Sequence, residues 1–377
     1  MQVCGIVTEY NPFHNGHQYH ITQARSIRNC DCLIAIMSGN FVQRGEPAII
    51  DKWERAACAV AHGVDIVIEL PYPYATQSAD IFAQGAIRLL TLANVNHMVF
   101  GSECNDIEKL KHLSEQAAAL PVQKKQAMVK SFADSCTQIA SNDLLGISYL
   151  KALQGSAIQP YTIQRTNSYH ELTYTKTIAS ASAIRHGIML HQDVHHATVM
   201  ANKLDTTYAF THYYPYLQTL LMTMDREDIK AMLMVEEGME QLLQKNAALY
   251  SDMDSFVNAC ISKRYTRSRI QRTLLHILTQ TKKTEIQKLR PLQHLRILAM
   301  NDVGRAYLSQ LRKQDDLIIA SRFNQIPQDW RKIELRATQA YTYPLTPKNR
   351  KEAIAKEWQS LVCLLYTSPS PRDRSLS

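Results

Sequence analysis

The stretch VTEYNPFHNGHQYH, Val7 to His20, decides the fold because it joins an apolar, strand-like run to a helix-like segment. The run begins at Val3 and is rich in valine and isoleucine, as buried parallel strands are. Pro12 keeps the start of the following loop extended. The stretch therefore predicts a strand, a tight loop and a helix, which is the first part of a βαβ unit.

The same alternation continues through the first hundred residues. Apolar runs that predict strands are Val3–Thr8, Cys32–Met37, Val64–Leu70 and His97–Gly101. Segments with helical periodicity between them are His17–Arg28, Lys52–His62 and Ala79–Leu92. Strands and helices in this order predict an α/β fold with a Rossmann-like, doubly wound parallel sheet. Ligands of such sheets bind at the carboxyl ends of the strands.

From about Asp193 helical periodicities dominate, as in Ile270, Leu274 and Ile277. We therefore expect two domains, a catalytic domain over residues 1–192 and a mainly α-helical, basic C-terminal domain over residues 193–363. The end of the chain, Leu364 to Ser377, is rich in serine, proline and arginine and resembles adapter-derived sequence. We expect this tail to be non-native and leave it out of the fold prediction.

Composition narrows the class of protein. The chain has 377 residues and a net charge of +8, which favours a polyanionic partner. Its eight cysteines lack the paired spacing of a zinc site, and we expect reduced thiols and no metal site. No apolar run approaches the ~18 residues of a membrane span, and no signal peptide is recognisable, so we expect a cytoplasmic protein without membrane contact.

The motif His14-Asn15-Gly16-His17 follows the first strand, where helix N-terminal N–H groups favour an anion. Gly16 lets the backbone approach a ligand, and both imidazoles can donate to phosphate oxygens. Surface histidines are one alternative. A metal site is another, because His14, His17 and His20 are spaced three apart, but no acidic or cysteine ligand accompanies them at zinc-like spacing.

A second motif, ASASAIR (Ala179 to Arg185), ends the predicted α/β half. Its hydroxyls and guanidinium suit a triphosphate or a leaving pyrophosphate, although serine-rich helix caps are also common. We expect the catalytic residues to be His14, His17, Ser180, Ser182 and Arg185.

Basic residues concentrate between Lys263 and Arg290. This segment contains nine lysines or arginines and only one acidic residue, Glu285. Tyr265 lies among them and could stack on a base. Arg44, in NFVQRGEP after the second strand, could contact substrate or RNA. A solvated basic surface is the alternative. The residues expected to bind RNA are Arg44, Lys263, Arg264, Arg267, Arg269, Arg272, Lys282 and Lys283.

Together these motifs resemble the H-x-G-H nucleotidyltransferase superfamily. The longer stretches GIVTEYNPFHNGHQYH, MSGNFVQRGEPAIIDKWERA, GVDIVIELPYPYATQSADIFAQGAI, NDLLGISYLKAL and LRILAMNDVGRAYL resemble the bacterial tRNA(Met) cytidine acetate ligase family. The resemblance extends over about Met1 to Ile326.

The resemblance implies an enzyme that makes acetyl-adenylate from acetate and ATP, with Mg²⁺. It would transfer the acetyl group to N4 of the wobble cytidine, position 34, of elongator tRNA(Met). The ATP-binding residues it implies are Val7, Thr8, Glu9, Tyr10, Asn11, Pro12, Phe13, His14, Asn15, Gly16, His17, Gln18, Tyr19, His20, Gly101, Asn142, Arg165 and Thr166. No general base for the transfer can be named from the sequence.

Two alternatives remain. One is an adenylyltransferase that makes a dinucleotide cofactor precursor, but such enzymes are usually small, and the basic helical half argues against it. The other is a non-catalytic RNA-binding protein on a nucleotidyltransferase fold. The intact H-x-G-H and SASAIR motifs argue against that reading.

Overall fold

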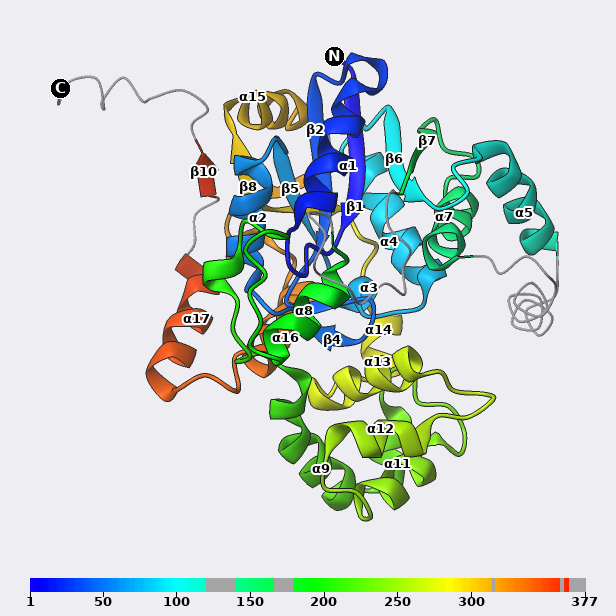
Figure 1. Cartoon of the computed structure of the whole chain (residues 1–377), viewed down its shortest axis with the longest axis vertical. Coiled ribbons are helices and arrows are strands. Elements are labelled where there is room, and N and C mark those ends of the chain that lie inside the picture. The colour runs from blue at the N-terminus through cyan, green and yellow to red at the C-terminus, as the bar shows by residue number, and fades with distance from the viewer. Residues whose placement is uncertain (120–139, 166–178, 314–315, 360–362, 366–377) are drawn as a thin grey trace.

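A computed structural model of the chain describes residues 1–119, 140–165, 179–313, 316–359 and 363–365. An eight-stranded sheet lies at its centre, in the order β10-β8-β5-β2-β1-β6-β7, with β9 beside β8 (Figure 1). The strands are β1 (Val3–Thr8), β2 (Cys32–Ser38), β5 (Ile66–Leu70), β6 (His97–Ser102), β7 (Gln159–Gln164), β8 (His294–Asn301), β9 (Ile318–Ala320) and β10 (Cys363–Leu365).

The five strands from β5 to β7 run parallel. The chain moves outward from β1 through β2 to β5 and then returns to place β6 and β7 on the other side of β1. The order thus reverses between β1 and β6, which is where doubly wound sheets bind ligands. The predicted Rossmann-like sheet is confirmed.

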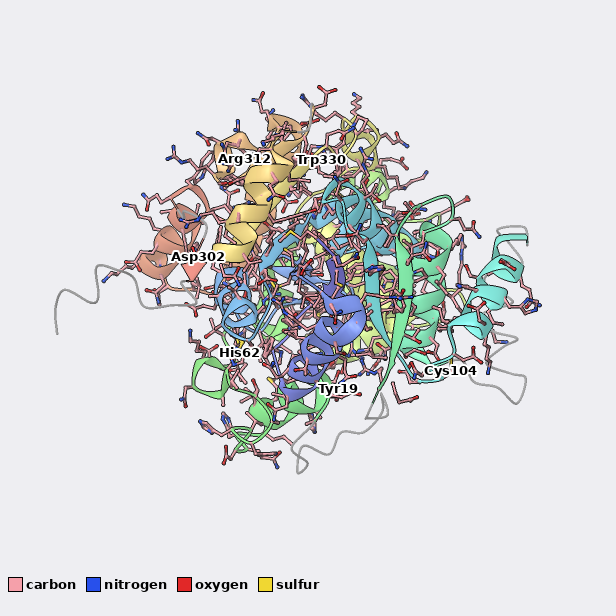
Figure 2. All side chains as sticks on the ribbon, turned by 90° about the horizontal axis from the view of Figure 1, so that it is seen from above. Tyr19, His62, Cys104, Asp302, Arg312 and Trp330 are labelled. Atoms are coloured by element: carbon pink, nitrogen blue, oxygen red, sulfur yellow. The ribbon has the colours of Figure 1, made fainter. Side chains whose placement is uncertain are left out.

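Helices cover both faces of this sheet. One face packs against α1 (Asn15–Ser26) and α2 (Lys52–Ala61), and the other against α4 (Ala79–Leu92) and α7 (Ser141–Ala152). Alternate residues of β2 serve the two faces, which explains its unbroken apolar run. Figure 2, the view from above, shows α1, which carries Tyr19, across the sheet from α15 (Asp302–Leu311).

The first helix differs from its predicted bounds for local reasons. It begins two residues earlier than expected, at Asn15, because His14 caps it. It ends at Ser26, since a short 3₁₀ turn follows in which Arg28 has a φ of 54°. The helix Ala79–Leu92 has the predicted bounds.

A helical region follows the α/β half, as expected, and packs around its own apolar core. Its helices are α9 (Tyr214–Thr223), α10 (Arg226–Ala231), α11 (Met239–Ala247), α12 (Met253–Cys260) and α13 (Arg267–Leu278). Figure 1 shows most of them as a group below the sheet. The hairpin of β3 (Phe41–Val42) and β4 (Glu46–Pro47) contacts α13.

The strand pairing differs from the expected division at residue 193. Strand β8 returns to the first sheet and pairs antiparallel with β5, and both β9 and β10 pair with β8. The reason is burial: β8 is covered almost throughout, and it pairs with strands on both sides, so it lies inside the sheet. Leu364 and Leu365, expected to belong to a foreign tail, lie in β10 and pair with Met300 and Asn301.

A buried charge network ties the C-terminal segment to the sheet. Lys52 Nζ donates to Glu69 and to Glu357 at 2.7 and 2.8 Å, and Arg296 contacts the same two carboxylates. Because all four side chains are buried, each charge needs its partners to offset desolvation. Glu357 thereby holds α17 (Pro347–Gln359) against the strands.

Further α-helices lie in the described ranges. They are α3 (Tyr72–Ala75), α5 (Ile107–Ala119), α8 (Ala181–Met189), α14 (Lys283–Gln287) and α16 (Gln328–Tyr341). Within the described ranges, no helix combines the length and apolar character needed to cross a membrane.

Candidate active site

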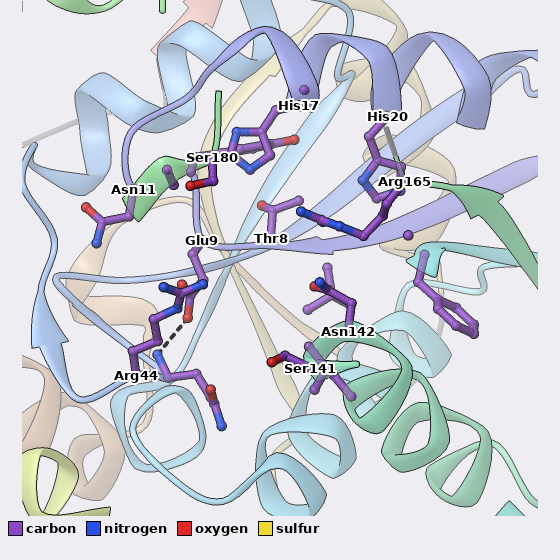
Figure 3. A pocket seen from close by; sticks show the side chains of 18 of the residues that line it. Thr8, Glu9, Asn11, His17, His20, Arg44, Ser141, Asn142, Arg165 and Ser180 are labelled. Atoms are coloured by element: carbon purple, nitrogen blue, oxygen red, sulfur yellow. Dashed lines mark hydrogen bonds between the residues drawn. The ribbon is translucent and has the colours of Figure 1, made fainter. Parts of the chain in front are cut away.

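A cavity of about 420 Å³ lies at the carboxyl ends of β1 and β6, at the reversal of strand order. This volume is within the range of small-molecule sites, roughly 300–1,000 Å³. Figure 3 shows that side chains from β1, α1, α7 and the hairpin converge on it. Of the residues predicted for catalysis or ATP binding, those in its wall are Val7, Thr8, Glu9, Tyr10, Asn11, His14, Gly16, His17, Tyr19, His20, Gly101, Asn142, Arg165, Ser180 and Arg185.

The two motif histidines form a reciprocal cap at the start of α1. The Gly16 N–H donates to His14 Nδ1 at 3.0 Å, and the His14 N–H donates to His17 Nδ1 at 3.2 Å. Their rings stack with centroids 3.7 Å apart. Because each Nδ1 accepts a backbone N–H, the proton of each neutral ring lies on Nε2. Both imidazoles are thus fixed as Nε2–H donors.

Burial keeps these rings neutral. It lowers the pKa of His14 to about 3, with Arg165 and Arg185 adding to the effect. Burial likewise brings the pKa of His17 well below its usual value. His20 has its pKa lowered to about 4 mainly by burial, and its Nε2–H donates to the Val99 carbonyl at 3.2 Å. His14 and His17 therefore offer neutral donors to an anion at physiological pH.

The second motif forms the adjacent wall. Ser180 caps α8, its Oγ accepting the Ala183 N–H at 3.0 Å. Arg185, one turn further along, donates to the Asn11 carbonyl at 2.8 Å and to Glu46 at 3.1 Å. The N-termini of α1 and α8 therefore meet at one cavity together with a guanidinium, an arrangement that favours phosphate groups.

Another part of the wall is formed by the end of β6, by α7 and by the residue after β7. A side chain at Gly101 would place its Cβ 3.2 Å from Arg165, so glycine lets this arginine lie against the strand end. Arg165 Nε lies 3.7 Å from Glu103, and Asn142 Nδ2 donates to the same carboxylate at 2.5 Å. Glu103 thus orients both predicted ligand-binding side chains.

Some predicted residues lie outside the wall. Pro12, Phe13, Asn15, Gln18 and Ser182 do not line the cavity. Ser182 Oγ instead accepts a hydrogen bond of 2.5 Å from Arg44. Thr166 lies outside the described residues.

Sequence reasoning missed part of the wall. Gln43 and Ser141 lie next to the predicted residues Arg44 and Asn142. Their position in the same motifs could have identified them. Ser268 comes from the helical region, and nothing in the sequence indicated that it lines the cavity. The other missed lining residues are Ala79, Phe82, Phe100, Leu144, Leu145, Tyr149, Ile163, Gln164, Ala179 and Ala181.

Arg44, expected to contact substrate or RNA, and Arg272, expected to bind RNA, lie at the cavity and at the hairpin beside it. Arg44 lines the cavity beside Gln43. Arg272 is only 9% exposed, and its Nη1 donates to the Gln43 carbonyl at 3.0 Å, because α13 packs its face against the hairpin here. Tyr265 is buried in the helical core, so its ring cannot stack on a base. The expected stacking of Tyr265 is therefore wrong, and the RNA contacts of Arg44 and Arg272 stay predictions.

Other basic residues of the segment are paired with acids from α10 to α12 and the loops between them. Glu236 contacts both Arg264 and Arg269. Arg267 pairs with Asp254, and Lys282 lies 3.5 Å from Asp228. Lys283 Nζ donates to a backbone carbonyl at 2.7 Å. The local excess of positive charge is therefore smaller than the sequence indicates.

Within the described parts of the chain, no three His, Cys, Asp or Glu side chains converge as a metal centre would require. The geometry suits positioning of a polyphosphate and stabilisation of charge that develops on it.

Comparison with known proteins identifies the group to which this chain is similar. The HIGH Nucleotidyl Transferase family matches residues 1–357. The tRNA(Met) cytidine acetate ligase of Oceanobacillus iheyensis is 37% identical, covering 97% of this chain and 100% of that protein. The enzyme of the same name from Leuconostoc citreum is 40% identical over 86% and 88% of the two chains.

Two solved structures have the same fold. The apo crystal structure of Thermotoga maritima TmcAL is 28% identical, with a TM-score of 0.86 over 97% of this chain and 100% of that one. The same protein bound with alpha-thio ATP has a TM-score of 0.85 at equal identity and coverage. With these matches over nearly its whole length, the chain belongs to the tRNA(Met) cytidine acetate ligase family.

Proposed function

We propose that this protein is an ATP-dependent ligase that acetylates N4 of the wobble cytidine of elongator tRNA(Met). One observation carries the chemistry: two neutral imidazoles, fixed as Nε2–H donors, meet the N-termini of α1 and α8 in one cavity. That arrangement suits a triphosphate. The names of its relatives and the nucleotide in the Thermotoga structure support the choice of substrates.

In the first step the acetate carboxylate attacks the α-phosphorus of ATP and pyrophosphate leaves in line. This step needs positioning and charge neutralisation more than a side-chain nucleophile. The proposed roles of His14 and His17 are to donate to phosphate oxygens. Arg185 and the N-terminus of α8 at Ser180 would hold the leaving pyrophosphate.

In the second step the cytidine amine attacks the acetyl carbon and AMP leaves. The base must be turned out of its stack to reach the cavity. Basic residues of the helical region that remain partly exposed, including Arg264 and Arg267, are proposed to contact the tRNA backbone. A reaction on tRNA also leads us to infer a cytoplasmic location.

Mg²⁺ is treated as part of the MgATP substrate. The described wall contains one carboxylate, Glu9, which does not amount to a protein ligand set. When bound to ATP, the ion would neutralise phosphate charge, and His14, His17 and Arg185 would act directly on the nucleotide.

The experiment is an assay with labelled acetate, ATP and elongator tRNA(Met), followed by nucleoside analysis of position 34. We expect one acetylcytidine for each AMP and pyrophosphate formed, and no label in the same tRNA with uridine at position 34. Transfer of the nucleotide itself to a small phosphorylated acceptor would instead establish an adenylyltransferase. RNA binding without turnover of either kind would establish a binding protein.

A further inference from the structure

Glu9 is unusual in the cavity because it is the one Asp or Glu among the described lining residues. Three arginines and three histidines also line the wall. A negative charge beside a triphosphate and a carboxylate substrate weakens the binding of both. A carboxylate in that position therefore calls for a different partner, one that carries a hydrogen-bond donor or a proton to be removed.

The carboxylate is held by one oxygen. Glu9 follows β1 directly, and its Oε1 accepts the Gln43 N–H at 2.8 Å, the dashed bond in Figure 3. Within the described part of the chain Oε2 receives no hydrogen bond, and the side chain is half-buried. One oxygen is thus fixed, and the other stays available to a ligand.

The hairpin that holds Glu9 is itself fixed by the helical region. The Gln43 carbonyl accepts a hydrogen bond of 3.0 Å from Arg272 of α13. Gly45 has a φ of 84°, and a Cβ there would lie 2.4 Å from the Arg272 backbone nitrogen, so the hairpin and α13 approach backbone to backbone. The orientation of Glu9 therefore depends on contacts with α13.

The part of the cavity wall near Glu9 includes a residue of the helical region. Ser268, from the first turn of α13, lines the cavity together with Gln43 and Arg44. In Figure 3, Glu9 extends toward Arg44, whereas His17 and Ser180 lie close to each other at the top of the view. A base presented by an RNA on the helical region would reach the Glu9 side of the cavity first.

We propose that Glu9 is the general base of acetyl transfer, with Oε2 accepting a proton from the exocyclic N4 amine of cytidine. The proposal rests on the function proposed above. As the amine nitrogen bonds to the acetyl carbon, the carbon–oxygen bond to the phosphate breaks and its electron pair leaves with AMP. The N–H proton moves to Glu9 and then to water.

The chemistry explains why a base is needed. The lone pair of a cytosine amine is delocalised into the ring, so the amine is a weak nucleophile until its proton is removed. A positioned carboxylate supplies that function and typically contributes about 10²–10⁴-fold. His14 and His17 are unsuited to it, because their Nδ1 atoms already accept backbone N–H groups.

The test uses Glu9→Gln, which keeps an oxygen for the Gln43 N–H. Acetyl-adenylate made by the enzyme is captured either by tRNA or by hydroxylamine, a strong nucleophile that needs no base, and both products are measured. The ratio of tRNA acetylation to acetohydroxamate should fall about 10²–10⁴-fold. Glu9→Asp should recover part of that ratio. Glu108→Gln, on an exposed side chain of α5, is the matched control.

Equal loss of both products in Glu9→Gln would overturn the proposal, because Glu9 would then act on ATP or acetate. An unchanged ratio would overturn it too. Thermal unfolding of each variant separates misfolding from chemistry. Failure of the proposed function has a different signature: wild-type protein would form neither acetohydroxamate nor acetylated tRNA.

Discussion

The cavity and the basic helix α13 use charged side chains in opposite ways. In the cavity, residues of two short motifs converge, with buried imidazoles kept neutral and arginines in the wall. Along α13, Arg267 and Arg269 pair with carboxylates of the neighbouring helix and loop, and Arg272 packs inward. A dense run of positive charge in a sequence is therefore weaker evidence for a binding surface than a few residues with fixed hydrogen-bond geometry.

The largest effect should follow from a change in the cavity. Arg185→Gln removes a guanidinium that faces the proposed pyrophosphate position and pairs with Glu46. We expect the rate of acetate-dependent adenylation to fall about 10²–10³-fold, as when one positioned charge-stabilising donor is removed. Arg226→Gln, on α10, is the control. Equal rates in the two variants would mean that Arg185 does not contribute to adenylation.

An intermediate effect concerns a buried imidazole on α13. His276 is fully buried, donates to the Thr76 carbonyl at 3.1 Å, and has its pKa lowered to about 3 by burial. Between pH 6.5 and 3 the unfolded chain binds a proton there and the folded chain does not, so acidification destabilises the fold. This group contributes about 1.4 kcal/mol per pH unit below 6.5.

Urea unfolding at pH 6.5 and pH 5 measures that contribution. The loss of unfolding free energy should be about 2 kcal/mol smaller in His276→Gln than in wild type. The change of unfolding free energy with pH is informative even if the variant is less stable than wild type at both pH values. Identical losses in the two proteins would mean that His276 is already protonated in the fold.

The smallest effect should come from the surface of the basic segment. Lys263→Ala removes an exposed cation, so tRNA affinity should fall by less than about tenfold, with the log–log salt slope lower by about 1. Lys109→Ala on α5 should change neither quantity. Binding measured at several salt concentrations would distinguish them. A loss of more than about a hundredfold would mean that Lys263 is more than a backbone contact.

Local patterns predicted what depends on neighbours in sequence. His14 and His17 lie within one helical turn, and their site follows from a strand-to-helix junction that the sequence makes evident. The return of β8 to β5 joins segments more than two hundred residues apart, which periodicity cannot reveal. A similar separation hid the contact of Arg272 with Gln43. The pairing of Glu236 with Arg264 and Arg269 spans fewer residues, but it too depends on tertiary packing that periodicity does not show.

The most direct measurement is exchange of labelled pyrophosphate into ATP, with Mg²⁺, with or without acetate and without RNA. The proposed activation of acetate at the paired histidines predicts exchange that requires acetate and drops about 10²–10³-fold in His17→Ala, but not in the exposed α5 variant His112→Ala. Exchange that is independent of acetate, or that persists in His17→Ala, would contradict the assignment of this cavity to acetate activation.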